Sequence, residues 1–173
     1  MIETNVAALE KLKAVAESAY QKWRKDATNL QEWWEAIDQF YRLAFPGGLG
    51  HGLKSLAAND LNAIESAVCV LEVDPWFFRS GYIKAELVKQ LSRVPLSDDQ
   101  RGRLRSVILQ RIRGRDIREF RSYCRLAPIV ADQMFVQAVA DLAASSEPLA
   151  SRHAGWVLTY LHPAKDPGVD RKT

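Results

Sequence analysis

Apolar side chains recur every three or four residues along most of the chain, with polar residues between them. The first such run, over 5–25, places its apolar residues near one face: Val6, Leu9, Leu12, Ala16, Ala19 and Trp23. This spacing is typical of an amphipathic helix. Sustained period-two alternation and Asn-Gly or Asp-Gly turns, which mark strands and hairpins, do not occur in the sequence. We therefore expect an all-α fold.

Start and stop signals divide the following runs into helices. Two residue pairs have the spacing of a capping box, in which each side chain bonds the other residue's backbone amide: Thr28 with Gln31, and Ser97 with Gln100. Asp60 is expected to cap a helix that runs to about 73, and Asp74 with Pro75 to begin another. Gly114 is expected to end the helix that Ser97 opens.

The later part of the chain is predicted to be a series of helix pairs. Further helices are expected at 115–127, from Pro128 to 143 and from Ser146 to 161, which gives pairs at about 60–92, 98–126 and 128–161. With hairpins of this length and turn residues such as Asp74 and Gly114, the chain resembles HEAT-like α-helical repeat proteins over roughly 60–161. The resemblance implies stacked antiparallel helical hairpins, and an irregular helical bundle is the alternative.

Length and composition indicate a single helical domain over 1–161, with a helix pair at 1–45 and the hairpin stack at 60–161. The segment 162–173 is rich in proline, glycine and charge, and is expected to be a flexible tail. Cys69 and Cys124 lie among apolar neighbours and are expected to be buried. No leader signal or membrane-length apolar stretch is evident, so the expected location is cytoplasmic.

Arginine is concentrated in one segment. Residues 101–125 hold nine arginines but only two carboxylates, so this segment carries a net charge of +7 while the rest of the chain carries −4. On a helix over 115–127, four of the arginines would share one side, opposite an apolar side that includes Phe120 and Tyr123. With Arg111 of the preceding helix, we take the following as a candidate partner-binding face: Arg111, Arg115, Arg118, Arg121 and Arg125.

Three interpretations of this arginine face stay open. Guanidinium pairs well with carboxylates and phosphates, so the face can bind an acidic protein surface or a nucleic-acid backbone. It can also be a solvated face paired with carboxylates of the chain itself: Asp98, Asp99, Asp116 and Glu119. Nucleic acid is the weaker of the two binding hypotheses, because the whole chain carries only +3 and stacking aromatics are not interleaved with the arginines.

Two aromatic clusters offer further candidate contacts. One comprises the adjacent Trp33 and Trp34 with Phe40 and Tyr41, and the other comprises the adjacent Trp76, Phe77 and Phe78 with Tyr82. Neighbouring residues on a helix lie about 100° apart, so members of each cluster cannot all face the core. Exposed aromatics are typical anchors of binding sites. The alternative is that all of these rings are buried between two neighbouring helices; if one is exposed, we expect it to be Trp34 or Trp76.

Catalytic and cofactor motifs are not found in the sequence. Residues 47–55 are similar to a phosphate-binding loop, but Leu53 separates the second glycine from Lys54, and the preceding residues are predicted to be helical. This segment is expected to be a flexible loop. His51 could act as a general base only beside a nucleophile. The other histidines are too scattered for a metal site, and His153 is expected at or near the helix surface. We therefore assign no catalytic residue, cofactor or metal.

The hypothesis favoured by the sequence is a non-catalytic protein-binding helical module. Small helical proteins without motifs resemble bacterial immunity, inhibitor or adaptor proteins, and this resemblance implies an acidic protein partner docked on the arginine face. A nucleic-acid-binding helical repeat and an enzyme of unrecognised type are the alternatives.

Overall fold

The computed structural model describes residues 6–162, which fold entirely into helices and their connections. The all-α prediction is confirmed for these residues. In chain order the helices are α1 (Val6–Lys25), the short 3-10 helix η1 (Ala27–Asn29), α2 (Leu30–Ala44), α3 (Leu49–Ala57), α4 (Leu61–Val73), α5 (Ser80–Leu91), α6 (Asp98–Arg113), α7 (Phe120–Val130), α8 (Gln133–Ala143) and α9 (Pro148–Leu161).

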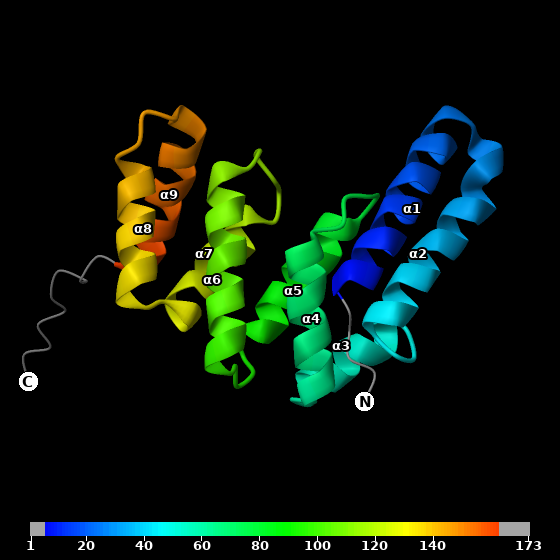
Figure 1. Cartoon of the computed structure of the whole chain (residues 1–173), viewed down its shortest axis with the longest axis horizontal. Coiled ribbons are helices and arrows are strands. Elements are labelled where there is room, and N and C mark those ends of the chain that lie inside the picture. Colours follow the sequence, from blue (N-terminus) through cyan, green and yellow to red (C-terminus); the bar gives the residue numbers. More distant parts are fainter. Residues whose placement is uncertain (1–5, 163–173) are drawn as a thin grey trace, which may run out of the picture.

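The helices from α4 onward pair into three hairpins that stand side by side (Figure 1). The first helices of the hairpins contact one another in order, α4 with α6 and α6 with α8. The second helices do the same, α5 with α7 and α7 with α9. This is a two-layer stack in which each hairpin buries its apolar side against the next.

Helix α4 lies at the centre of the molecule. It contacts the α1–α2 pair, α3, its own partner α5, and α6. Its sequence is apolar almost all round, and the buried side chains include Ile64, Val68 and Leu71. A helix with apolar residues on every side is stable only when neighbours cover it on every side. The composition of α4 therefore places it where the N-terminal helices meet the hairpin stack.

Several predicted helix boundaries are confirmed. The Ser97–Gln100 capping box forms with both of its hydrogen bonds, and Gly114 is the C-cap of α6. The Asp60 carboxylate accepts a hydrogen bond from the Ala63 amide at the start of α4. These signals depend on residues three or four positions apart, so tertiary structure does not alter them.

Two boundary predictions near the N-terminus are wrong. The cap before α2 is made one turn earlier, because the Asp26 carboxylate accepts from the Thr28 amide and η1 intervenes. Gln31 bonds Glu35 instead of closing a capping box.

The expected flexible loop at 47–55 is largely helix α3, entered through Gly47 and Gly48 at positive φ. Tertiary contact compensates for its glycines: a Cβ at Gly52 would lie 2.3 Å from the Phe45 ring, so only glycine permits this packing.

Four helix starts in the hairpin stack, those of α5, α7, α8 and α9, also differ from the predictions. Asp74 is the left-handed C-cap of α4 rather than the N-cap of a new helix, and α5 begins only at Ser80. The predicted helix at 115–127 begins at Phe120 and runs through Pro128, which lies in its last turn. Asp132 caps α8 in place of Pro128, and Glu147 precedes Pro148 of α9 in place of Ser146. Most of the expected tail at 162–173 lies outside the described residues.

Candidate binding grooves beside α5

The structure divides the arginine-rich segment into groups with different surroundings. Arg103 bridges Glu65 and Glu72 of α4 at 2.5 and 2.7 Å, and Arg105 pairs with Asp132 at 3.1 Å. Arg101 donates to two backbone carbonyls, those of Leu96 and Ile129. Arg103 and Arg105 thus connect α6 to the hairpins before and after it, and Arg101 joins α6 to α7 within its own hairpin. Part of the excess positive charge therefore has a structural use within the molecule.

Arg111 belongs to a buried charged cluster and not to an open face. Its guanidinium bonds Asp74, and the other Asp74 oxygen lies 2.7 Å from the Lys84 ammonium. Lys84 is 2% exposed and also pairs with Glu119 at 2.9 Å. Burial raises the pKa of the Asp74 carboxyl, but the charges of Lys84 and Arg111 outweigh burial and hold this pKa below its ordinary value. The expected placement of Arg111 beside the other four arginines is thus wrong.

Arg115 and Arg118 lie in the turn before α7, not on a helix face, because the helix begins at Phe120. Each covers one face of an aromatic ring from the neighbouring hairpin. The Arg115 guanidinium lies 4.4 Å from the centre of the Trp76 ring, and that of Arg118 lies 4.5 Å from the centre of the Tyr82 ring. Arg118 also donates a hydrogen bond to the Tyr82 hydroxyl. The sequence could not indicate these pairs, since 36 residues or more separate their members.

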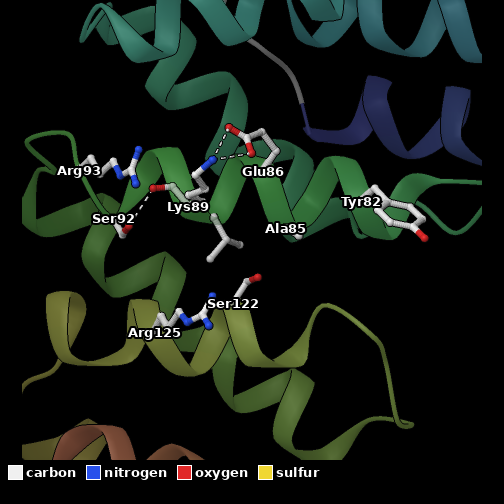
Figure 2. Close-up of a pocket in the computed structure, with 9 residues that line it drawn as sticks. Tyr82, Ala85, Glu86, Lys89, Ser92, Arg93, Ser122 and Arg125 are labelled. Carbon is white, nitrogen blue, oxygen red and sulfur yellow. Dashed lines mark hydrogen bonds and ion pairs between the residues drawn. The ribbon is translucent and has the colours of Figure 1, made fainter.

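Arg121 and Arg125 are the candidates that point outward from α7. Both are exposed, and neither forms an ion pair with any residue that the structure describes. Arg125 and Ser122 form one wall of a groove of about 500 Å³, and α5 forms the other wall. Figure 2 shows Arg93 and Arg125 toward one end of this groove and Tyr82 at the other end. We call it the cationic groove.

The charges that line the cationic groove sum to about +2, from Lys89, Arg93 and Arg125 against Glu86. Glu86 is occupied by the Lys89 ammonium at 3.2 Å and the Gln90 amide at 2.8 Å. Burial raises the pKa of Glu86, yet these hydrogen bonds and the charge of Arg93 hold it below its ordinary value. The carboxylate is therefore ionised at neutral pH. Arg93 acts on it only at longer range, and neither Arg93 nor Arg125 forms an ion pair with a carboxylate of residues 6–162.

A second, apolar groove adjoins the cationic one. Its volume is about 320 Å³, and we call it the aromatic groove. Its walls come from α2, α3, the 75–79 turn and α5, and its lining includes Trp33, Trp34, Leu53, Phe78 and Tyr82. Tyr82 and Glu86 line both grooves, so the two share one wall.

The two aromatic residues named as the candidates for exposure are both exposed, Trp34 at 53% and Trp76 at 46%, so complete burial of the two clusters is wrong. The structure places the two residues differently. Trp34 lines the aromatic groove, whereas Trp76 lies under Arg115. Phe78 and Tyr82 belong to the second aromatic cluster but were not the expected exposed residues, and they are 50% and 56% exposed. Residues four positions apart share one face of a helix, and this spacing was the signal that the sequence offered for Phe78 and Tyr82. The signal does not apply in a simple way, because Phe78 lies in the turn at 75–79 and only Tyr82 lies on a helix.

The residues considered for catalysis have structural surroundings. Ser55 lies near His51, but the hydroxyl and the imidazole Nε2 are 3.5 Å apart, beyond the usual reach of proton transfer. No carboxylate among the described residues bonds His51. His153 is fully buried, contrary to the prediction, with hydrogen bonds to Asp116 at 2.7 Å and to the Ile112 carbonyl at 3.1 Å. Within 6–162 no cluster of three or more metal-ligating side chains occurs.

Comparison with known proteins gives no match: no family model matches the chain, and neither a curated protein nor a solved structure matches it. Among the described helices, none combines the length and the apolar character needed to cross a bilayer. Functional inference therefore depends on the geometry of the two grooves.

Proposed function

We propose that this chain is a non-catalytic helical module that binds an acidic surface of a partner protein in the cationic groove. The observation that supports this most directly is the pair Arg93 and Arg125, which come from the turn after α5 and from α7 and line one groove. Each guanidinium carries five donors in a rigid fork suited to carboxylates. Arg121, exposed one turn before Arg125 on α7, extends the positive surface.

The neighbouring aromatic groove favours a protein partner over a nucleic acid. Protein interfaces are enriched in tryptophan, tyrosine and arginine, and these three residue types meet around α5. Bases bind by stacking on open aromatic faces. Arg115 and Arg118 already cover one face of Trp76 and of Tyr82. The stacking surface left to a nucleic acid is correspondingly smaller.

The architecture supports the same proposal. Stacked hairpins in two layers are the arrangement of HEAT-like repeats, and such solenoids present extended surfaces to their partners. The resemblance made from the sequence, over roughly 60–161, covers this same stack from α4 to α9. A role as an immunity, inhibitor or adaptor protein is consistent with such a surface, and the partner's identity decides among these roles.

The test is a pull-down from an extract of the source cells with three baits. The groove variant carries Arg93→Glu and Arg125→Glu, and the control variant carries Lys11→Glu and Arg113→Glu, which change the net charge by the same amount. Lys11 and Arg113 are exposed and line neither groove. We expect a protein that the unmodified chain and the control capture, and that the groove variant captures at least about tenfold less.

Nuclease treatment separates the two binding hypotheses. Capture of a protein partner should persist after digestion of nucleic acids and should weaken as salt rises. Equal capture by all three baits would contradict the proposal. Capture lost on digestion would instead support the nucleic-acid alternative.

A further inference from the structure

We infer that the aromatic groove receives a bulky apolar side chain from the same acidic segment that occupies the cationic groove. The ligand class is thus an acidic peptide segment with one aromatic or large aliphatic anchor. This inference rests on the proposed function and adds the chemistry and spacing of the partner segment. It follows from the apolar lining, the rigidity and the position of the aromatic groove.

The aromatic groove has the size and lining of a side-chain pocket. Ligand pockets span roughly 300 to 1,000 Å³, and the groove, at about 320 Å³, is at the lower end of this range. Its surface is formed largely by Trp34, Phe78 and Tyr82, each of which is half exposed. Leaving such rings in water is unfavourable, so covering them with an apolar group stabilises a complex.

The floor of the groove is already ordered by packed rings. Trp33 is 2% exposed and stacks on Trp23 with ring centres 4.7 Å apart. The rings of Trp34 and Phe78 lie 4.8 and 6.1 Å from that of Trp33. Two groove residues are therefore positioned by a buried ring between them. A side chain can enter without reordering the walls, which reduces the entropy lost on binding.

The shared wall determines how far apart the apolar anchor and the carboxylates of the ligand must be. Tyr82, Glu86 and Lys89 follow one side of α5 at helical spacing, and Arg93 lies in the turn just after the helix ends at Leu91. With 1.5 Å per residue, Tyr82 and Lys89 lie roughly 10 Å apart along the axis of α5, and Arg93 lies beyond its last turn. An extended peptide covers roughly 10 Å in about three residues and needs about one or two more to pass the end of the helix. The ligand carboxylates should therefore follow or precede the anchor by about three to five positions.

The charges along the shared wall restrict the ligand's amino-acid sequence further. Arg79 lines the aromatic groove, and no residue within 6–162 forms an ion pair with it, so the rim there is also positive. Glu86 lies at the junction of the two grooves and would repel a carboxylate placed directly above it. We therefore expect neutral residues between the anchor and the carboxylates.

Fluorescence anisotropy with fluorescein-labelled peptides tests the inference. The probe contains one phenylalanine, two serines and three glutamates in this order, and a second probe has the reverse order. In two comparison peptides, alanine replaces the phenylalanine or glutamines replace the glutamates. We expect the unmodified chain to bind one of the two probes at least about tenfold tighter than either comparison peptide.

Protein variants locate the anchor. Trp34→Ala and Phe78→Ala should each weaken probe binding about tenfold, because they remove walls of the aromatic groove. Both residues are half exposed, so the fold should survive, and circular dichroism checks this. Met134→Ala is the matched control, because Met134 is 82% exposed on α8 and should leave binding unchanged.

The outcomes separate the inference from the proposed function. If the alanine peptide binds as tightly as the probe while Arg93→Glu with Arg125→Glu abolishes binding, the anchor is wrong and the proposed function stands. If the glutamine peptide binds equally well, the acidic partner is wrong and both fall. Both also fall if a thymidine oligonucleotide of equal charge binds tighter than the probes. Absence of probe binding in both orders up to about 1 mM overturns the inference alone.

Discussion

Among the lysine, arginine, aspartate and glutamate residues that the structure describes, Lys84 is the most deeply buried. Its ammonium is buried between the carboxylates of Asp74 and Glu119, at 2.7 and 2.9 Å. Gly81 makes room for this pair, since a Cβ there would lie 2.7 Å from a Glu119 oxygen. A buried charge is stable only when partners replace its lost hydration. The two carboxylates therefore depend on Lys84 as much as it depends on them.

We predict that Lys84→Met lowers the free energy of unfolding by about 3 to 5 kcal/mol, because Asp74 and Glu119 lose their common partner in a buried site. Urea denaturation followed by circular dichroism measures the change. Lys89→Met is the matched control five residues further along α5, where an exposed pair with Glu86 is broken. Its cost should stay below about 1 kcal/mol. Similar losses for the two variants would show that the cluster around Lys84 contributes little.

Helix α6 begins with a complete capping box, and its side chains connect it to the hairpins on both sides. The Ser97 hydroxyl accepts from the Gln100 amide at 3.2 Å, and the Gln100 side chain accepts from the Ser97 amide at 3.1 Å. Further along, Arg103 binds α4 and Arg105 binds the residue that caps α8. The register of α6 therefore affects the hairpins on both sides.

Ser97→Ala should reduce the free energy of unfolding by about 1 kcal/mol, because the first turn of α6 loses its reciprocal cap. Thermal or urea denaturation measures it. Ser106→Ala, in the same helix, removes an exposed hydroxyl that bonds only the carbonyl one turn before it. That control should change stability by less than about 0.5 kcal/mol. If the two substitutions had equal effects, the capping box would not be a stabilising feature of α6.

The helices themselves were predictable from the sequence, because apolar periodicity and local caps act over a few residues. The caps at Asp60 and Ser97 are confirmed for this reason. The prediction failed at Asp74, where the Asp-Pro pair has a helix-starting pattern. Its carboxylate is engaged by Lys84 and Arg111, which lie 10 and 37 residues further along the chain. A local pattern contains no information about such distant partners.

At the scale of the whole molecule, ion pairs connect successive hairpins. Arg103 on α6 binds the α4 carboxylates Glu65 and Glu72, and Arg152 on α9 binds Asp116 before α7. Burial raises the pKa of Glu65, but hydrogen bonds from Arg103 and Gln100 lower it below its ordinary value of 4.5. With the pKa of Asp74 also lowered, the folded stack stabilises ionised carboxylates.

The stack should therefore lose stability in acid. A carboxyl group whose pKa is lower in the folded state contributes stability above its unfolded value, here about 4 to 4.5, and this contribution disappears as pH falls through the folded value. We expect the urea midpoint to be constant between pH 7 and 5 and to fall steadily below about pH 4. Glu65→Gln should show a smaller decline below pH 4, because one titrating group is missing. Equal midpoints at pH 6 and 3 would contradict this.

The candidate site was only partly predictable, because it depends on which helices become neighbours. The excess of arginine at 101–125 was evident in the sequence, and Arg125 does line a groove. Arg93 lies outside that segment and meets Arg125 only because α5 packs beside α7. Arg115 and Arg118 instead lie over aromatic rings of the preceding hairpin. The periodicity of a single helix cannot indicate this pairing.

The Lys84–Glu119 ion pair has a consequence for the width of the cationic groove. Lys84 belongs to α5 and Glu119 immediately precedes α7, so this buried contact joins the two helices that form the groove walls. Neither side chain lines the groove. The distance between the two walls therefore depends on this buried ion pair. A substitution at either residue would change which ligands fit, although neither side chain contacts the ligand.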